Sequence, residues 1–412
     1  MKNIFYKISY NTIVQITGKV ISLLLSLVSV GILTRYLGKD NFGNFTLSIA
    51  YLSFFTIFAD LGLQLTMPRD LSKRGLYSDD VYSTYLFLKI LLTLLFILLS
   101  NICIIFFPYS HTLKFGIFLA SFGVGLGLLN NTGTTILQSK LRLDLVTLID
   151  VFVKVITVGF IGIFIYLKLG LNSILLTILI GNFFGSIFTL LLLKKFIRIK
   201  LIFDICQAKK LIKKSLPVSL ISLFTILYFK IDTIILSIIK SPSDVGIYGL
   251  SYKVLENILI FWGFYIASIY PLLSSLLSQS KIKQAKKVWT HSIMIALLSS
   301  LLIFFISYVF SGEIIYILGG RDFQPSNGVL KILLLALPMF FINNLFYHLF
   351  LVNEKIKVIF TIIISTLVIN IFLNIIFIPK YSYNAAAVNT VVTEFFLFIF
   401  YILSFKKQKL FR

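Results

Sequence analysis

Several charged residues of this sequence lie inside apolar segments that are long enough to cross a lipid bilayer. The segment from 215 to 239 is one of them, and it contains Lys230 and Asp232. The next apolar segment contains Lys253 and Glu256, one helical turn apart. A charged group at membrane depth costs at least about 2.5 kcal/mol, so such residues usually face a bundle interior or a water-filled cavity. We therefore interpret this part of the chain as part of a transport pathway.

Asp232 is the most demanding of these charges, because it lies deep in its apolar segment. A lone carboxylate is strongly disfavoured there, so we expect it to be protonated, paired or in contact with water. Lys230 is two positions away and points to a different face of the predicted helix, which leaves Lys253 as the better partner. We hypothesise that Asp232 and Lys253 form a cavity-facing pair that exchanges with an anionic substrate or a coupling ion. A purely structural pair is the alternative.

Other charged residues lie inside predicted spans as well. Those of the first half all lie near the same predicted membrane face, which suggests a ring of polar groups around an inner vestibule: Lys19, Asp60, Lys89, Asp150 and Lys154. The three lysines are reasonable partners for a phosphate group, as point charges on flexible stems. For Lys89 and Asp60, mutual pairing that only holds helices together is an open alternative. Glu394 lies too deep to reach an interface by snorkelling, so we expect it to line a cavity with Lys230 and Asp232.

The composition places the chain in a membrane. Of its 412 residues, 58% are hydrophobic and only 13% are charged, which is more apolar surface than a soluble core can hide. The net charge of +23 could suggest nucleic-acid binding. The basic residues, however, lie mainly in loops on one side of the predicted spans, as the positive-inside rule describes. We therefore expect no nucleic-acid partner.

Long hydrophobic runs predict an all-α integral membrane protein with twelve spans. They cover residues 12–34, 42–65, 82–107, 114–138, 145–167, 173–193, 215–239, 247–278, 289–311, 327–352, 357–378 and 384–405. An even number of spans places both termini on the same side of the membrane. The loops after the even-numbered spans and the C-terminal tail are basic, so we expect that side to be the cytoplasm and the membrane to be the cytoplasmic membrane.

A basic stretch at 194–214 separates the predicted spans into two groups of six. We expect an N-terminal six-helix lobe at 1–193 and a C-terminal six-helix lobe at 215–412. The basic stretch between them is predicted to be a cytoplasmic linker, held near anionic lipid headgroups by its charge.

The two predicted lobes share a short sequence echo. Residues 38–48 read GKDNFGNFTLS and residues 241–251 read SPSDVGIYGLS, so that Gly43 and Gly246 occupy equivalent positions. Each segment lies between the first and second spans of its lobe. The echo predicts two repeats that have the same orientation in the membrane.

The residue types that catalysis or metal binding requires are few and scattered. The three histidines, His111, His291 and His348, lie on different predicted loops and helices, and Cys103 and Cys206 lack the spacing of metal ligands. No nucleotide-binding or hydrolase motif is present in the sequence. The predicted extracytoplasmic loops are too short for a catalytic domain. We therefore expect no catalytic residue, no metal and no cofactor.

Four stretches carry a resemblance to a known family. They are LGKDNFGNF at 37–45 with ADLGL at 59–63 and Pro68-Arg69; KIDTIIL at 230–236 with VGIYGLSYK at 245–253; GRDFQPSNGVLKIL at 320–333; and NIFLNIIFIPKYSYNAAAVNTVVTE at 370–394. In the last stretch the matching residues are Asn370, Asn374, Pro379, Tyr381, Ala385, Ala386, Thr390 and Glu394. In this order and within twelve spans, the chain resembles the polysaccharide repeat-unit flippases of the Wzx type, in the multidrug/oligosaccharidyl-lipid/polysaccharide exporter superfamily.

The resemblance implies two six-helix lobes around a central cavity and transport by alternating access. It implies as substrate an undecaprenyl-diphosphate-linked oligosaccharide, destined for O-antigen, capsule or exopolysaccharide. The substrate-binding candidates in the cavity are the charged residues named above: Lys19, Lys89, Lys154, Lys230, Asp232, Lys253, Glu256 and Glu394. Membrane lipids and a coupling ion are further expected partners. An ion-coupled small-molecule or drug antiporter of the same architecture is the alternative, and a membrane-embedded polymerase or ligase is disfavoured by the short loops.

Overall fold

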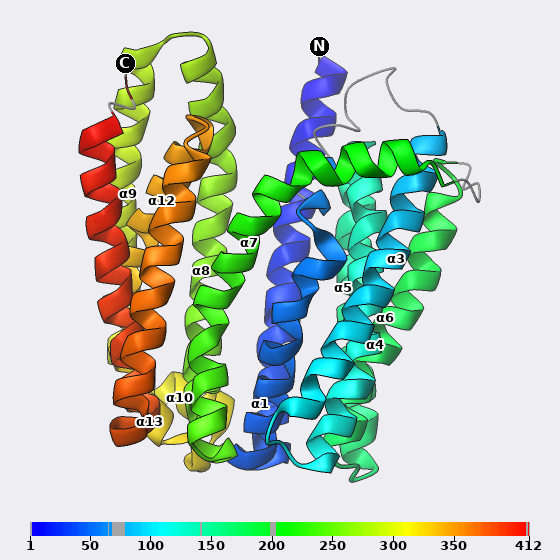
Figure 1. Ribbon diagram of the computed structural model, residues 1–412, viewed down its shortest axis with the longest axis vertical. Helices are drawn as coiled ribbons and strands as arrows, with labels where there is room; N and C mark the ends of the chain where they lie inside the picture. Colours follow the sequence, from blue (N-terminus) through cyan, green and yellow to red (C-terminus); the bar gives the residue numbers. More distant parts are fainter. Residues whose placement is uncertain are drawn as a thin grey trace. The chain divides into compact units, whose positions relative to one another are not determined.

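The protein is built from helices, several of which are bent or broken (Figure 1). The structure is a computed structural model, which describes residues 2–64, 66–67, 79–140, 142–197, 203–408 and 411. These residues form α1 Lys2–Asp60, α3 Asp79–Cys103, α4 His111–Ser139, α5 Leu143–Tyr166, α6 Leu171–Leu193, α7 Ile205–Ile239, α8 Pro242–Ser278, α9 Ile282–Val309, α10 Ser311–Gly319, α11 Pro325–Leu334, α12 Leu337–Val352 and α13 Ile356–Gln408. Two short 3-10 turns, Ile104–Phe106 and Arg321–Phe323, join them, and the described residues contain no strand.

Three features of these helices explain how twelve predicted spans fit the observed helices. The longest helices, α1 and α13, are each two helices joined at a break, at Gly38 with φ of 67° and at Ser382 with φ of 49°. Both backbones are in the left-handed region, where the helical path cannot continue. In addition, α11 and α12 meet at a bend of 45° and together are long and apolar enough for one span. Counted in this way, the described helices account for all twelve predicted spans.

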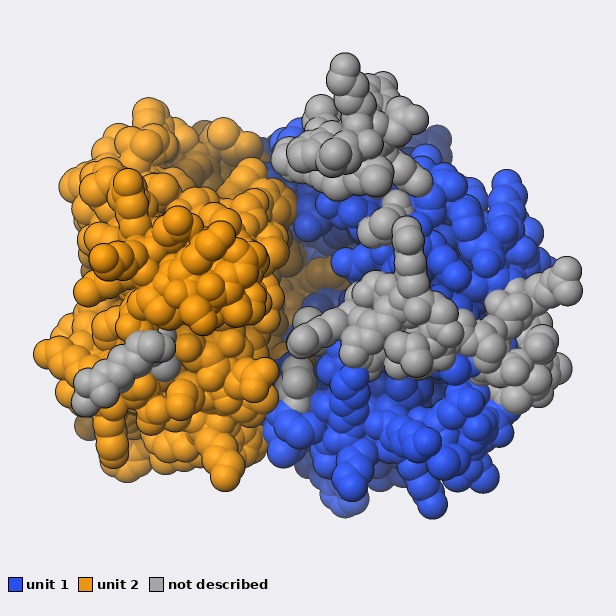
Figure 2. All heavy atoms as spheres, turned by 90° about the horizontal axis from the view of Figure 1, so that it is seen from above, with its two compact units in different colours: residues 1–37, 48–223 blue, residues 38–47, 224–412 orange. Residues whose placement is uncertain are grey.

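The chain forms two compact units, shown in different colours in Figure 2. Unit 1 comprises residues 1–37 and 48–223, and unit 2 comprises residues 38–47 and 224–412. The contacts thus group the first part of α7 with unit 1, whereas the predicted C-terminal lobe began at residue 215. They also group the turn at 38–47 with unit 2, although the sequence places it among the first spans.

Small residues bring the helices of unit 1 close together. A Cβ atom on Gly123 of α4 would lie 2.6 Å from the backbone nitrogen of Leu179 of α6, and one on Gly133 would collide with the side chain of Thr189. Close approach of this kind is a usual way for helices to associate in lipid, because burial of apolar surface drives association only weakly there.

The first turns of α7 show that part of the predicted linker at 194–214 is helical. From Ile205 onward this stretch is helical, and Figure 1 shows it running across the ends of the upright helices of unit 1. Ala208 and Leu211 are buried in an apolar cluster with side chains of α3, α4, α5 and α6. The lysines of this segment are exposed: Lys209, Lys210, Lys213 and Lys214. The segment is therefore an amphipathic helix whose apolar face is covered by unit 1.

In unit 2, the two segments of the sequence echo contact each other. A Cβ atom on Gly43 would collide with the carbonyl oxygen of Pro242, and one on Gly246 would collide with the carbonyl oxygen of Lys39. The pairs are reciprocal, because Lys39 precedes Gly43 by the same number of residues as Pro242 precedes Gly246. This contact explains why the turn at 38–47 belongs to unit 2.

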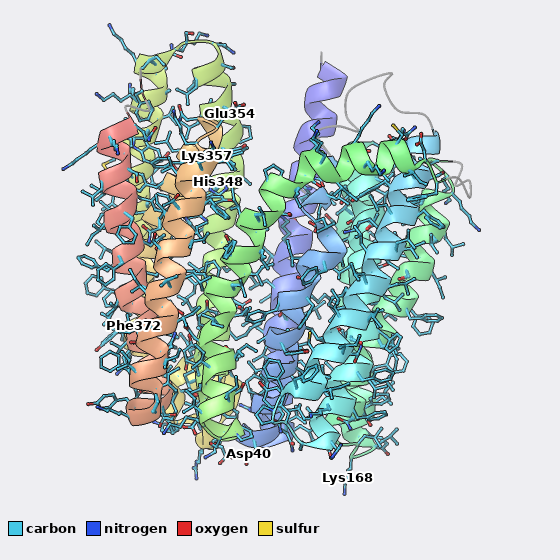
Figure 3. All side chains as sticks on the ribbon, viewed as in Figure 1. Asp40, Lys168, His348, Glu354, Lys357 and Phe372 are labelled. Atoms are coloured by element: carbon cyan, nitrogen blue, oxygen red, sulfur yellow. The ribbon has the colours of Figure 1, made fainter. Side chains whose placement is uncertain are left out.

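The outer surface of unit 2 is apolar along its helices and charged at its ends. Figure 3 shows Phe372 part of the way along α13, with 62% of its surface exposed, as expected for a lipid-facing side chain. Glu354 and Lys357 lie at one end of the helices of this unit and Asp40 lies at the opposite end. The basic loop around Lys357 and the turn at 38–47 thus lie at opposite ends of the unit, as the predicted topology requires.

Candidate functional site

Asp232 lies at the centre of a buried network in unit 2, with only 3% of its surface exposed. Its carboxylate accepts hydrogen bonds from the Tyr248 hydroxyl at 3.1 Å, from the Thr390 hydroxyl at 3.0 Å and from the Asn374 amide. Asn374 also donates to Asn370 at 3.0 Å. Every hydrogen-bond partner that the structure gives to Asp232 is neutral, so the carboxylate is stabilised by side-chain dipoles of α8 and α13.

The hypothesis that Asp232 pairs with Lys253 is wrong. The Lys253 ammonium donates to Glu256 at 3.0 Å, and the Lys230 ammonium donates to the other carboxylate oxygen of Glu256. Lys253 and Glu256 are neighbours because they lie one turn apart on α8. As expected, Lys230 and Asp232 point to different faces of α7. The Lys230 side chain points toward Glu256. Asp232 faces α13 instead.

The Lys230–Glu256–Lys253 cluster carries an excess of one positive charge inside membrane-spanning helices. The side chains are partly accessible, at 25%, 27% and 41% for Lys230, Glu256 and Lys253. The Lys230 ammonium also lies 5.5 Å from the centre of the Tyr252 ring. The cluster has two cations, one anion and partly accessible side chains, so it can attract an anionic group.

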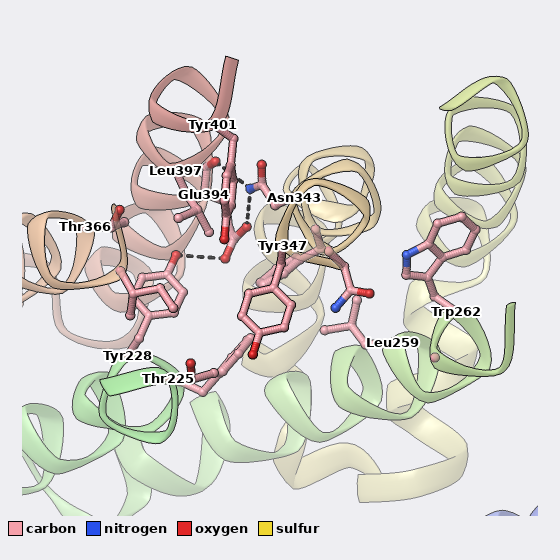
Figure 4. Close-up of a pocket in the computed structure, with 15 residues that line it drawn as sticks. Thr225, Tyr228, Leu259, Trp262, Asn343, Tyr347, Thr366, Glu394, Leu397 and Tyr401 are labelled. Carbon is pink, nitrogen blue, oxygen red and sulfur yellow. Dashed lines mark hydrogen bonds between the residues drawn. The ribbon is translucent and has the colours of Figure 1, made fainter. Parts of the chain in front are cut away.

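Glu394 is the second buried carboxylate of unit 2, with 1% of its surface exposed. It accepts hydrogen bonds from the Tyr228 hydroxyl and from the Asn343 amide, both at 2.8 Å (Figure 4). Tyr228 lies one turn before Asp232 on α7, and Glu394 lies one turn after Thr390 on α13. The two buried carboxylates therefore occupy successive turns of the same pair of helices. Glu394 also borders a cavity of about 290 Å³, which neither Lys230 nor Asp232 lines.

In unit 1, Lys89 and Asp60 form an ion pair, which is the alternative to ligand binding that the sequence allowed for them. The Lys89 ammonium donates to Asp60 at 2.9 Å and to the carbonyl of Ala59 at 2.8 Å, and only 2% of the residue is exposed. This ammonium is buried and bonded twice to the end of α1, so it holds α3 against α1 and is not presented to a ligand.

The other two lysines of unit 1 that are binding candidates lie in a different environment. Lys19 of α1 and Lys154 of α5 are both exposed, and both are close enough to Asp150 to act on it electrostatically. Unit 1 thus repeats the composition of the cluster in unit 2, with one carboxylate facing two lysines.

The structure adds functional candidates that sequence reasoning missed. Tyr248, Asn374 and Thr390 hold the Asp232 carboxylate. The sequence presents Asn374 and Thr390 only as matches to a family pattern. The spacing of Asn370 and Asn374, four residues apart in an apolar segment, is typical of a polar face buried in a bundle. Nothing in the sequence around Tyr248 indicated its role.

The described residues contain no group of three or more histidine, cysteine or acidic side chains that could hold a metal ion. Asp232 and the neutral oxygens around it could instead hold a proton or a small monovalent cation. Buried carboxylates in membrane helices commonly do so in pumps and transporters.

Comparison with known families decides the class of the protein. A family model described as polysaccharide biosynthesis protein matches residues 8–277. The chain belongs to this family. The MatE family model matches residues 217–376. The chain is also similar to a membrane protein of Methanocaldococcus jannaschii, with 27% identity over 90% of this chain and 92% of the relative.

Solved structures show the fold of this family member. The lipid II flippase MurJ aligns with a TM-score of 0.76 and 17% identity, over 96% of this chain and 87% of its own. A multidrug resistance MATE family transporter of the MOP superfamily aligns with a TM-score of 0.79 and 15% identity, over 96% of this chain and 97% of its own. These structures confirm the predicted all-helical membrane fold of twelve spans in two lobes. The family model confirms the resemblance to a polysaccharide biosynthesis family. The chain thus shares a multi-pass membrane fold with a lipid II flippase and a multidrug resistance transporter.

Proposed function

We propose that this polysaccharide biosynthesis protein is a flippase for undecaprenyl-diphosphate-linked oligosaccharide repeat units. It moves them across the cytoplasmic membrane, by alternating access, for the synthesis of a surface polysaccharide such as O-antigen, capsule or exopolysaccharide. The observation that carries the proposal is the Lys230–Glu256–Lys253 cluster, which is partly accessible and has an excess of positive charge within membrane helices. Family membership supports the same conclusion.

The chemistry of the substrate matches this cluster. A lipid-linked oligosaccharide combines an apolar tail with an anionic diphosphate and a polar glycan that cannot cross hydrocarbon unaided. Without substrate, Glu256 is bonded to both lysines and offsets one of their two charges. A diphosphate brings additional negative charge and can bond to one ammonium while Glu256 keeps the other, so neither lysine becomes an unpaired charge.

A second set of groups in unit 1 supports the proposal. Lys19 and Lys154 both act electrostatically on one carboxylate, Asp150, and both residues are exposed. We assign them the same role as the cluster of unit 2, contact with the diphosphate. Lys89 has a structural role, because its ammonium is buried and bonded.

Asp232 is the proposed site of a coupling ion. Its carboxylate is deeply buried and its hydrogen-bond partners are neutral, so uptake of a proton or a monovalent cation would cancel its charge without breaking an ion pair. The gain or loss of that charge would change how strongly α7 and α13 are held together. Such a difference gives an ion a means to bias a transporter between conformations.

Transport in proteoliposomes tests the proposal. Lipid-linked oligosaccharide with a labelled sugar is incorporated, and the fraction that becomes accessible to an impermeant lectin on the opposite leaflet is measured over time. The triple variant Lys230→Gln, Lys253→Gln, Glu256→Gln removes the cluster without leaving an unpaired carboxylate. We expect its rate to fall at least about ten-fold, equivalent to the loss of one charge-assisted contact.

A matched control distinguishes this site from net charge alone. Lys168→Gln removes the same net charge from an exposed position and should leave the rate unchanged. Normal transport by the triple variant would refute the assigned diphosphate site. Absence of lipid-linked oligosaccharide transport by the unmodified protein would refute the proposed function.

A further inference from the structure

The first turns of α7 present a row of exposed lysines. Lys209, Lys210 and Lys213 form no ion pair with the residues that the structure describes. The acidic residue closest to them along the chain is Asp204, and its carboxylate accepts hydrogen bonds from two backbone nitrogens of the first turn, at 2.8 and 3.1 Å. Asp204 therefore caps the start of the helix and is not bonded to the lysines.

The lysines of this row are neighbours on the helix surface. Lys209 and Lys213 are four residues apart, and Lys210 follows Lys209 directly. Like charges four residues apart on a helix repel each other. A ligand with two adjacent negative charges can bond to neighbouring ammonium groups at the same time and remove this repulsion. The row therefore favours a multiply charged anion, such as a diphosphate, over a singly charged one.

The same face of α7 becomes apolar where the helix continues into its membrane span. Leu216 and Leu220 lie three and seven residues after Lys213, on the same side of the helix, and are 45% and 41% exposed. The opposite side is covered, because Ala208 and Leu211 are buried in the apolar cluster of unit 1. Exposed charge followed by exposed apolar surface matches a lipid that has an anionic headgroup at the membrane surface and a chain in the hydrocarbon.

A second set of lysines begins further along the same helix. Lys230, which belongs to the Lys230–Glu256–Lys253 cluster, lies beyond Leu220 on α7. One helix, Ile205–Ile239, thus carries lysines at its exposed start and another lysine inside its span. The start of this helix lies on the side that the basic loops predict to be cytoplasmic. A lipid approaching along α7 from that side meets the exposed lysines first.

We propose that the first turns of α7 are the docking site for the diphosphate of the lipid-linked substrate. Lys209, Lys210 and Lys213 bond to the diphosphate, and the isoprenoid chain lies in the bilayer along Leu216 and Leu220. The substrate binds here first, and its diphosphate then moves to the Lys230–Glu256–Lys253 cluster. The inference rests on the proposed function for the identity of the lipid and adds a docking step to it.

A fluorophore on Cys206 tests the proposal at the site itself. Cys206 is exposed and lies three residues before Lys209, on the same face. The full-length Cys103→Ser protein is labelled at Cys206 with an environment-sensitive dye and placed in phosphatidylcholine nanodiscs. Farnesyl diphosphate, which has an isoprenoid chain and a diphosphate, should produce a saturable change in emission. Farnesol lacks the diphosphate and inorganic pyrophosphate lacks the chain, so each should bind at least about ten-fold more weakly.

Matched variants distinguish this site from net charge. The triple variant Lys209→Gln, Lys210→Gln, Lys213→Gln should weaken farnesyl diphosphate binding at least about ten-fold. Glutamine and lysine have similar helix propensities, so the unfolding temperature should match that of the parent. The control replaces by glutamine the three lysines of 283–287, which are exposed at the start of α9, and should bind normally. An equal loss in both variants would mean that only net charge matters and would overturn the proposal.

Transport in proteoliposomes tests the order of the two sites. The α7 triple variant should need at least about ten-fold more lipid-linked oligosaccharide to reach half of the maximal rate, and it should keep that maximal rate, because the Lys230–Glu256–Lys253 cluster is intact. The triple variant of that cluster should lower the maximal rate and keep the response at Cys206. A lower maximal rate in the α7 variant, without a change in the half-saturating amount, would overturn the docking role.

The remaining outcomes separate the docking site from other lipids and from the proposed function. Phosphatidylglycerol in the nanodiscs should not reproduce the response of Cys206 to farnesyl diphosphate. If it does, the row is a general surface for anionic lipids and the proposal fails. Transport by the unmodified protein without a response at Cys206 would refute the docking site and leave the proposed function standing. A response without any transport would refute the proposed function and leave a binding site for isoprenoid diphosphates.

Discussion

Glu256 and Asp232 show two ways to keep a carboxylate inside a membrane helix bundle. Glu256 is held between two lysines and is partly accessible, so an incoming anion can compete for its partners. Asp232 is buried and held by Tyr248, Thr390 and Asn374, none of which carries charge. The first arrangement suits exchange with an anionic substrate, and the second suits the binding of a proton or cation.

The substitution Asp232→Asn tests the role of the second arrangement. Asparagine keeps the shape and one carbonyl oxygen, and the hydroxyls of Tyr248 and Thr390 can rotate, so we expect normal amounts of protein in the membrane. Transport should fall at least about ten-fold, because the site can no longer gain or lose a charge. The additional change Lys253→Gln should not restore transport, since Lys253 is bonded to Glu256.

The exposed Asp322→Asn serves as the matched control and should transport normally. Normal transport by Asp232→Asn would mean that the buried carboxylate is only structural.

At the scale of elements, unit 2 depends on two kinds of feature. One is the breaks in α1 and α13, and the other is the close packing of the echoed segments. The sequence predicts the spans on either side of Gly38 and Ser382 correctly, because hydrophobic length is a local property. It does not predict that the segment around Gly43 packs on the segment around Gly246, because that contact joins distant parts of the chain. The amphipathic start of α7 was hidden for a related reason: its many lysines resemble a loop until their helical spacing is considered.

The crossing of the echoed segments should tolerate no added side chain. In Gly43→Ala the new methyl group would collide with the backbone carbonyl of Pro242, which cannot move aside as a flexible side chain would. We expect a loss of about 1–3 kcal/mol of stability from overpacking, seen as a lower unfolding temperature of the protein in detergent.

The matched control for this change is Gly159→Ala. A Cβ atom at Gly159 meets nothing within 4 Å, and alanine favours helix more than glycine does. Its unfolding temperature should therefore stay level or rise. If Gly43→Ala is as stable as Gly159→Ala, the two segments do not pack as closely as described.

At the scale of the whole molecule, the all-helical membrane class and the twelve spans could be predicted from hydrophobic length alone. Most of the charged candidates were also found, because a charge in an apolar span is conspicuous. Their partners could not be predicted: Asp232 is bonded to residues of α13 that lie far along the chain, and the choice depends on how α7, α8 and α13 are rotated about their axes. Local periodicity contains little information about that rotation.

Orientation in the membrane is the remaining prediction at this scale. The basic loops predict that both termini are cytoplasmic. Native Cys206 lies on the exposed face of the first turns of α7, beside the lysines. In a Cys103→Ser background it should therefore be labelled by an impermeant maleimide only after the membrane is permeabilised, and Lys283→Cys should behave in the same way.

Positions in the opposite turns provide the other half of the test. In a background that lacks both native cysteines, Ser243→Cys and Asp322→Cys should react in intact cells, because the positive-inside pattern places their turns outside. Labelling of Cys206 in intact cells together with protection of Ser243→Cys would invert the topology. The exposed lysines of α7 would then face the outside, away from the anionic inner leaflet that the charge distribution predicts they contact.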